Sequence, residues 1–365
     1  MSYKNPLVFI RCMTFNHASY IWEAMDGFCM QKTDFPYLAV ICDDASTDGE
    51  QKIINEYLQQ NFILDSDSEY LSLENEEAYI IYARHKQNAN CFFLVFYLKE
   101  NHYSQRKPKY HLWKKWTNSS KYVAICEGDD FWTDPLKLQK QIDYLEGHPR
   151  CTMVCNRTKI YSERLTVFVG EKYWYNKNRE LKTKEIIRRG GGAIQTASVI
   201  YRKDIINNYP DYCLRCATGD HPLQLTAAMK GYIYYMNDIM SVYRIDNSLS
   251  WIGSQKRKEA NVLRLKTLHT ITDMLSGFAK DYPKYKKSFE DRRAMYILNE
   301  IPNRFDNYEA MVETIHYFEK EIKEFSIWWK IDLFLRTTRI PILNRYYYKS
   351  KYIYNGYRAK FLKYK

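Results

Sequence analysis

The first part of the chain alternates short apolar runs with stretches of helical periodicity. Runs rich in large apolar residues predict buried strands at residues 7–12, 37–42 and 122–126. Apolar side chains recur every three or four positions at 19–31 and 51–60, which predicts amphipathic helices. Buried strands that alternate with helices are typical of a parallel sheet covered on both faces. We therefore predict an α/β fold with a doubly wound, mostly parallel sheet flanked by helices.

Weaker patterns lie between these elements. Residues 79–82 predict a short strand, and the acidic residues 65–77 predict an exposed loop. Residues 91–116 predict a helix, a surface insertion and a second helix, and residues 157–182 a hairpin or a mobile flap. The remaining expectations are a helix at 183–189 that stops at three glycines, then strands at 195–202, 232–235 and 239–244, and helices at 256–277, 284–299, 307–324 and 325–337.

Charge divides the chain at its C-terminal end. The net charge is +12, and residues 325–365 carry +9 of it, from ten Lys and Arg residues against Asp332 alone. The same segment holds twelve aromatic residues, and its apolar face includes Ile327, Trp328, Ile331 and Leu335. We expect this basic aromatic tail to bind an anionic membrane surface. The alternatives are packing of the aromatic side chains against the catalytic domain, and single-stranded nucleic acid, which we do not expect as a partner.

The chain shows neither a secretory signal nor an apolar run long enough to span a bilayer. Its nine cysteines are scattered and lie mostly in apolar runs, which indicates reduced thiols. We therefore expect a cytoplasmic protein, peripheral on the inner face of the cytoplasmic membrane. Its predicted parts are a catalytic domain at 1–255, a helical extension at 256–324 and the tail at 325–365.

Polar residues follow the predicted strands at the point where each strand ends. The sequence Glu127-Gly128-Asp129-Asp130 follows the predicted strand at 122–126, and Asp43-Asp44 follows the one at 37–42. Loops after the strands of such a sheet form its ligand crevice. Three carboxylates within four residues repel one another unless a cation or a basic partner relieves them, and hard divalent cations prefer oxygen ligands. The alternative for both motifs is an acidic turn that caps the following helix.

Taken in chain order, five motifs resemble the family 2 glycosyltransferases, which have the GT-A nucleotide-sugar fold and act in bacterial surface-polysaccharide synthesis. The motifs are Thr14-Phe15-Asn16, the run from Cys42 to Asp48, Glu127-Gly128-Asp129-Asp130, Gly219-Asp220 and Tyr243-Arg244. The resemblance covers residues 6 to about 250. It implies an inverting transferase that moves a hexosyl or N-acetylhexosaminyl group from a nucleotide-sugar, UDP-linked by family frequency, to a glycan or lipid-linked acceptor.

The resemblance also implies a role for each residue around the nucleotide. Thr14, Phe15 and Asn16 would line the base pocket. The carboxylates of Asp43 and Asp44 would accept hydrogen bonds from the nucleobase or ribose. Arg84 would be a further nucleotide contact, and Glu127 would face the ribose or sugar.

Three carboxylates carry the implied chemistry. Asp129 would hold Mn²⁺ or Mg²⁺ with Asp130 in support, and the metal would stabilise the departing diphosphate. Asp220 would act as the catalytic base, because the acceptor hydroxyl must lose its proton as it attacks. Two departures from the family pattern are Glu127, where Asp is commoner, and Gly219, where Glu is common. The histidines His17, His85 and His221 are expected to be hydrogen-bonding loop residues rather than metal ligands.

Two other functions compete with a transferase. A nucleotidyltransferase on a related sheet is disfavoured because no glycine-rich, basic loop follows the first strand to hold a triphosphate. A catalytically inactive, membrane-associated scaffold is disfavoured because Asp44, Asp129 and Asp220 are all present.

Overall fold

The computed structural model describes residues 5–65, 69–246, 260–302 and 305–349. The chain divides into two compact units. Residues 1–209 and 220–256 form the first, which we call the sheet unit, and residues 210–219 and 257–365 form the second, the helical unit. Part of the predicted basic tail, residues 350–365, lies outside the described residues.

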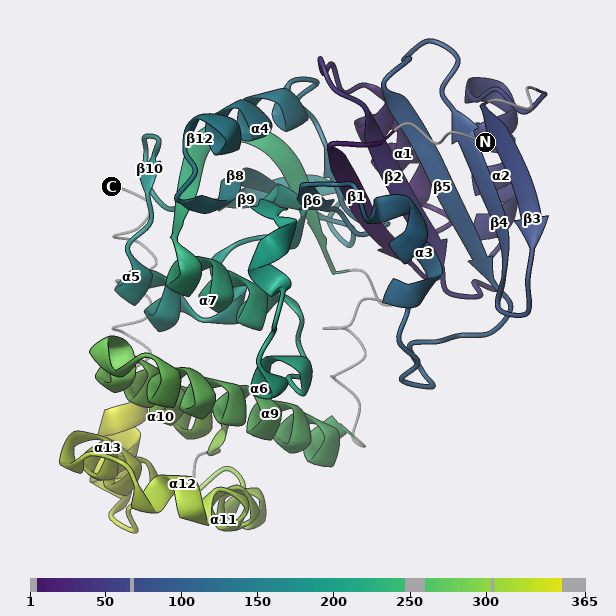
Figure 1. The fold of residues 1–365 in the computed structure, drawn as a ribbon. Helices are drawn as coiled ribbons and strands as arrows, with labels where there is room; N and C mark the ends of the chain where they lie inside the picture. The colour runs from purple at the N-terminus through teal and green to yellow at the C-terminus, as the bar shows by residue number, and fades with distance from the viewer. Residues whose placement is uncertain (1–4, 66–68, 247–259, 303–304, 350–365) are drawn as a thin grey trace. The chain divides into compact units, whose positions relative to one another are not determined.

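One mixed sheet organises the sheet unit (Figure 1). Its main path has the order β10-β12-β8-β11-β6-β1-β2-β5-β4-β3, while β7 pairs with β12 and β9 pairs with β8. The strands are β1 (Val8–Thr14), β2 (Tyr37–Asp43), β3 (Tyr70–Glu74), β4 (Ala78–Arg84), β5 (Cys91–Leu98), β6 (Tyr122–Ile125), β7 (Phe131–Trp132), β8 (Cys151–Ser162), β9 (Val167–Lys172), β10 (Arg179–Glu180), β11 (Ile200–Arg202) and β12 (Tyr232–Ile245).

The centre of the sheet is parallel. Strands β6, β1, β2 and β5 run in the same direction, and β8 and β12 form a second parallel pair. The antiparallel strand β11 joins these two parallel regions, and β4 and β3 add an antiparallel edge. The α/β fold with a parallel core is therefore confirmed.

Helices cover both faces of the parallel centre. α1 (Ile21–Cys29), α2 (Glu50–Asn61) and α4 (Lys137–Gly147) bury their apolar stripes in one core with the strands. On the other face, the Trp113 and Trp116 rings of α3 (Tyr110–Thr117) pack edge-on against Phe96 of β5. The sheet unit is completed by α5 (Thr183–Arg189), α7 (Asp220–Lys230) and the short helices η1 (Gly191–Ala193), η2 (Thr196–Ser198) and η3 (Lys203–Ile206).

Several weaker sequence predictions were wrong. Residues 91–98 form the buried strand β5 rather than a helix, because a strand covered on both faces is as uniformly apolar as a buried helix. The predicted loop at 65–77 contains the edge strand β3. The two strands expected at 232–244 are a single strand, β12, with irregular pairing in its middle. The segment 157–182 contains a hairpin of β8 and β9, one of its two predicted forms.

The helical unit has a separate apolar core. Its helices are α6 (Asp211–Leu214), α9 (Ala260–Asp281), η4 (Pro283–Tyr285), α10 (Lys286–Glu300), α11 (Tyr308–Tyr317), α12 (Glu319–Lys323), α13 (Ile327–Thr337) and a further helix at 341–349. Leu265, Leu298 and Phe318 lie at the centre of this core. Among the described residues, no helix is long and apolar enough to cross a membrane.

Candidate active site

The predicted site residues follow three neighbouring parallel strands. β1 lies between β2 and β6, and Thr14 at its end pairs with Asp43 at the end of β2. Backbone hydrogen bonds then join the loops, because the Asp44 N–H donates to the Thr14 carbonyl at 3.0 Å and the Gly128 N–H to the Met13 carbonyl at 3.0 Å. The loops after β1, β2 and β6 therefore form one edge, as expected for a ligand crevice at the carboxyl ends of parallel strands.

The buried carboxylate of Glu50, the first residue of α2, ties two of these loops together. It accepts hydrogen bonds from the Thr14 hydroxyl, the His17 N–H at 3.0 Å and the Ser46 hydroxyl at 2.8 Å. The Asn16 N–H in turn donates to the Ser46 hydroxyl oxygen at 2.9 Å. Thr14 and Asn16 thus hold the loops in place, whereas the Phe15 side chain is 41% exposed at the same edge.

Asp43 and Asp44 both accept hydrogen bonds from protein groups. The Asp43 carboxylate is buried, accepts from the Ser46 N–H at 3.2 Å and from the Gln51 side chain at 2.5 Å, and has its pKa raised to about 6 by burial. This is the turn-and-cap arrangement that the sequence left open. Asp44 instead binds the loop before α3, which is distant in the sequence.

The loop before α3 docks on the Asp44 carboxylate. The backbone N–H groups of His102 and Tyr103 donate to its two oxygens at 2.8 and 3.0 Å, and the Lys109 ammonium lies 3.0 Å from one of them. A carboxylate has about four acceptor positions, so one remains for a ligand.

The acidic motif after β6 separates its three carboxylates into different environments. Glu127 accepts a hydrogen bond from the Met13 N–H at 3.1 Å and lies 3.7 Å from the Arg11 guanidinium, yet burial raises its pKa. Asp130 is 3% exposed and accepts from the Arg244 N–H at 2.9 Å, and burial together with the charge of Asp129 raises its pKa well above the usual value.

Asp129 is the carboxylate of this motif best placed for a ligand. Its side chain is 19% exposed, and its described contact is with the His17 ring, whose Nε2 lies 3.9 Å from one oxygen. The other ring nitrogen of His17 lies 3.1 Å from the Thr14 hydroxyl, which orients the imidazole. One carboxylate beside one imidazole is a small ligand set, which suits a metal that takes its other ligands from substrate phosphates and water.

Gly128 allows the acidic motif to approach the end of β1. A Cβ atom at this position would lie 2.7 Å from the Thr14 Cβ and closer still to its hydroxyl oxygen. No side chain fits there without moving the backbone, so glycine sets the distance between the two loops.

A buried arginine supports the motif from β12. The Arg244 guanidinium donates to the Asp129 carbonyl at 2.7 Å and pairs with the carboxylates of Glu23 and Glu163. It also lies 4.7 Å from the centre of the Tyr20 ring. Because its donors are engaged by the protein, Arg244 positions the acidic motif.

Asp220 shares an environment with the acidic motif. It is the first residue of α7, its carboxylate accepts from the His221 N–H at 2.8 Å, and burial raises its pKa. The Tyr243 phenol responds to the charge of all three carboxylates. Its pKa is raised to about 12 by burial and by the charges of Asp130, Asp129 and Asp220. Tyr243 is therefore within electrostatic range of all three carboxylates.

The structure does not bring Arg84 to this edge. Arg84 ends the antiparallel strand β4 and pairs with Phe92, near the start of β5, whereas Asp43 pairs with Tyr97 towards its end. The Arg84 guanidinium forms a two-pronged ion pair with Glu69 at 2.5 and 2.9 Å. Arg84 thus lies at the opposite end of the parallel strands from the other predicted residues.

No family model matches the chain. Uncharacterized proteins of Mycobacterium tuberculosis and Mycobacterium bovis are 30% identical over 239 residues, which is 64% of this chain and 57% of theirs. The chain thus spans little more than half the length of these relatives.

Solved structures show lower sequence identity. S. aureus TarS 1–349 in complex with UDP is 14% identical, with a TM-score of 0.41 over 86% of this chain and 89% of that one. The mannosyltransferase PcManGT from Pyrobaculum calidifontis, in complex with GDP-Man and Mn²⁺, is 14% identical, with a TM-score of 0.44 over 91% of this chain and 81% of that one.

Proposed function

We propose that the protein is a metal-dependent, inverting glycosyltransferase that uses a nucleotide-sugar, with UDP as the nucleotide and a hexose or N-acetylhexosamine as the sugar. The observation that carries this proposal is the placement of Asp44 and Asp129 on loops that follow neighbouring parallel strands and are joined by backbone hydrogen bonds to the end of β1. The charge of Asp220 also acts on this region, because it helps to raise the pKa of Tyr243. The order of the sequence motifs supports the same reaction. The acceptor we propose is a glycan or a lipid-linked sugar of cell-surface polysaccharide synthesis.

In this proposal Asp129 holds Mn²⁺ or Mg²⁺, and Asp130 supports the loop that carries Asp129. The partly exposed Asp129 carboxylate and the adjacent His17 ring fit a metal whose remaining ligands are the donor diphosphate and water. The bound metal would neutralise charge on the departing diphosphate. Asp130 is 3% exposed and accepts the Arg244 N–H through one of its oxygens, so we assign it to holding the loop.

Asp220 is the proposed catalytic base. Its carboxylate would take the proton of the acceptor hydroxyl while that oxygen bonds to the anomeric carbon and the bond to the diphosphate breaks. Attack from the face opposite the diphosphate inverts the anomeric centre in a single displacement. Burial raises the pKa of Asp220, which makes its carboxylate a stronger base than an exposed aspartate.

The helical unit offers a surface for the membrane part of the proposal. One face of α13 exposes Ile327, Trp328, Ile331 and Phe334, while Trp329 and Leu333 on the same helix pack on the core. Lys330 and Arg339 are exposed nearby in the sequence. We propose that this face, which we call the α13 face, binds an anionic membrane that carries the acceptor. Trp329 thus packs on the core of the helical unit, whereas Trp328 is exposed.

The test of the transferase proposal measures donor binding and turnover separately. A panel of nucleotide-sugars with Mn²⁺ is first screened by thermal unfolding, because a bound donor stabilises the folded protein. Transfer or hydrolysis of the selected donor is then compared between wild type and Asp220→Asn, with loss of a general base expected to cost about 10²–10⁴-fold. Asp220→Asn should keep the donor-induced shift, whereas Asp129→Ala should lose its Mn²⁺-dependent part.

The matched control is Asp204→Asn, which removes an exposed carboxylate from the same unit and should leave both measurements unchanged. Wild-type turnover in both Asp220→Asn and Asp129→Ala would contradict the assignment of the site. Stabilisation by nucleoside triphosphates in place of nucleotide-sugars would instead favour a nucleotidyltransferase.

A further inference from the structure

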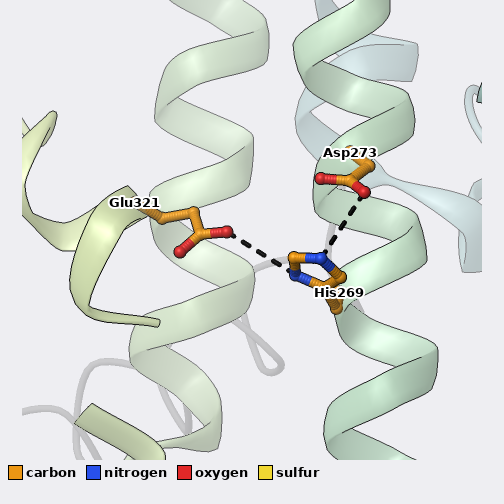
Figure 2. Close-up of side chains that lie close together, drawn as sticks. All are labelled: His269, Asp273 and Glu321. Atoms are coloured by element: carbon orange, nitrogen blue, oxygen red, sulfur yellow. Dashed lines mark ion pairs between the residues drawn. The ribbon is translucent and has the colours of Figure 1, made fainter. Parts of the chain in front are cut away.

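A second group of candidate metal ligands lies in the helical unit. His269 and Asp273 are one turn apart on α9, so their side chains share a face, and Glu321 of α12 faces them. Figure 2 shows the imidazole between the two carboxylates. Its Nε2 lies 3.5 Å from an Asp273 oxygen and its Nδ1 lies 3.6 Å from a Glu321 oxygen. We call these three residues the α9–α12 cluster.

The backbone beneath the cluster is held by the core of the helical unit. Leu268, next to His269, is 5% exposed, and Phe318, one turn before Glu321, is fully buried. Both side chains belong to the same apolar cluster, which fixes α9 against the segment that carries Glu321. The three side chains are thus brought together by packing.

The α9–α12 cluster has a net negative charge. Two carboxylates face one imidazole, so the net charge is negative whether or not the ring is protonated. Among the described residues, no Lys or Arg forms an ion pair with Asp273 or Glu321. The Glu321 side chain is only 9% exposed, and a buried carboxylate is costly without a compensating charge.

The spacing leaves the imidazole without a hydrogen bond. Both nitrogen–oxygen distances exceed that of a normal N–H···O bond, and the His269 Nδ1 is buried with no hydrogen-bond partner. When the ring proton is on Nε2, the buried Nδ1 is free to bind a cation beside the Glu321 carboxylate. One ligand atom from each residue lies within 4.8 Å of the others.

We propose that the α9–α12 cluster binds a Zn²⁺ ion that links α9 to α12. Imidazole and carboxylate ligands suit this ion, which is bound at about 2.0–2.2 Å, so the ligand atoms must move closer together than their present spacing of up to 4.8 Å. His269 supplies one nitrogen, Asp273 and Glu321 one oxygen each, and water the fourth ligand, which the exposed fractions of His269 (43%) and Asp273 (57%) allow. This site is independent of the proposed transferase activity and of the metal at Asp129.

Calorimetric titration of the full chain, freed of metal, with Zn²⁺ tests the proposal. His269→Ala should weaken the site at least tenfold and abolish the Zn²⁺-induced rise in melting temperature. The matched control is His316→Ala, because His316 is an 85% exposed histidine of the same unit that also lies beside a glutamate. Cobalt supplies a second readout: the visible absorption of bound Co²⁺ should disappear in His269→Ala and persist in His316→Ala.

Two further variants keep the test decisive. Asp273→Asn changes a mostly exposed side chain and should weaken Zn²⁺ binding without unfolding the protein. Asp129→Ala should leave the site intact, which separates it from the proposed donor metal. Equal Zn²⁺ affinity in wild type, His269→Ala and Asp273→Asn would overturn the proposal. A second result would also overturn it: Zn²⁺ leaves the melting temperature unchanged, while acidification raises it in wild type and not in His269→Ala. A protonated His269 would then join the two carboxylates without a metal.

Discussion

The two units differ in where they keep their charged groups. The sheet unit buries Asp43, Glu50, Asp130, Lys137 and Arg244, and each is hydrogen-bonded to other protein groups. In the helical unit most charged side chains of the described residues are at the surface, and α13 exposes an apolar face as well. Buried charge must be solvated by the fold itself. The comparison shows that the sheet unit solvates buried charged groups with its own hydrogen bonds, whereas the helical unit leaves most of its described charged groups to water.

The largest expected effect on stability comes from removing the buried arginine of the sheet unit. Arg244→Met leaves the carboxylates of Glu23 and Glu163 without their partner and should lower the free energy of unfolding by about 3–5 kcal/mol. Urea unfolding measures the change. Lys121→Met is the control, because its half-exposed ion pair with Glu146 should be worth about 0–1 kcal/mol. Equal losses in the two variants would remove the distinction between buried and surface charge.

A smaller loss is expected where the acidic motif meets β1. Gly128→Ala forces a methyl group against Thr14 and should cost about 1–3 kcal/mol in unfolding free energy. It should also weaken Mn²⁺-dependent donor binding, because the Asp129 loop must move. Gly147→Ala, at the end of α4, meets nothing within 4 Å and should change neither measurement. Normal donor binding in Gly128→Ala would show that the close approach does not set the site geometry.

The pH dependence of stability tests whether a charge is buried at Lys137. Burial lowers the pKa of this lysine to about 7, while its side chain donates to Gln141 at 2.7 Å. Above that value the unfolded chain binds one more proton than the folded chain, so stability rises with pH by about 1.4 kcal/mol per unit until the unfolded lysine also deprotonates.

Lys137→Met should remove this dependence, so that its advantage over wild type is largest at pH 7 and shrinks by pH 9. Urea unfolding at several pH values gives the difference between the two proteins. Lys140→Met is the control on the same helix, because a hydrogen bond to Asp134 raises the pKa of Lys140. An advantage of Lys137→Met that does not vary with pH would mean that Lys137 is charged in the folded protein.

The smallest effect is expected on the α13 face of the helical unit. Lys330→Gln should weaken binding to vesicles that contain anionic lipid by about 1 kcal/mol, or roughly fivefold. Vesicle flotation of the full chain measures it, with Lys280→Gln as an exposed lysine of the same unit that should have no effect. Trp328→Glu should lower flotation further. Unchanged flotation in Lys330→Gln and Trp328→Glu would exclude the α13 face, and preferential binding of single-stranded nucleic acid would identify the competing partner.

The parallel centre of the fold was predictable because β1, β2 and β6 are mostly apolar and alternate with amphipathic helices. The same signal misled at β5, since eight apolar residues in a row do not distinguish a buried strand from a buried helix. Its correct assignment depends on pairing with β2 and β4, which are distant in the sequence. The predictable part of the fold was therefore the part with local periodicity.

The candidate site was predictable to the same degree. Carboxylates after neighbouring parallel strands were expected to meet, and Asp43, Asp44 and Asp129 follow such strands. Glu50 was missed, because it acts through contacts between loops. His17 and Arg244 were named from the sequence, but their partners were not predicted, since Arg244 pairs with Glu23 across 221 positions of the chain. Arg84 was misplaced because the sequence does not reveal that β4 runs antiparallel to β5.

The bonds that Asp44 makes to the loop before α3 have a consequence for exchange of backbone protons with solvent. The amide protons of His102 and Tyr103 are held by the same carboxylate that the motif assigns to the nucleotide. They should exchange slowly in the free protein, because each is bonded to a buried acceptor. A ligand that draws the Asp44 oxygens towards itself would release these two protons, and one that uses only the remaining acceptor position would protect them further. The two amides thus report how a nucleotide enters, whichever sugar it carries.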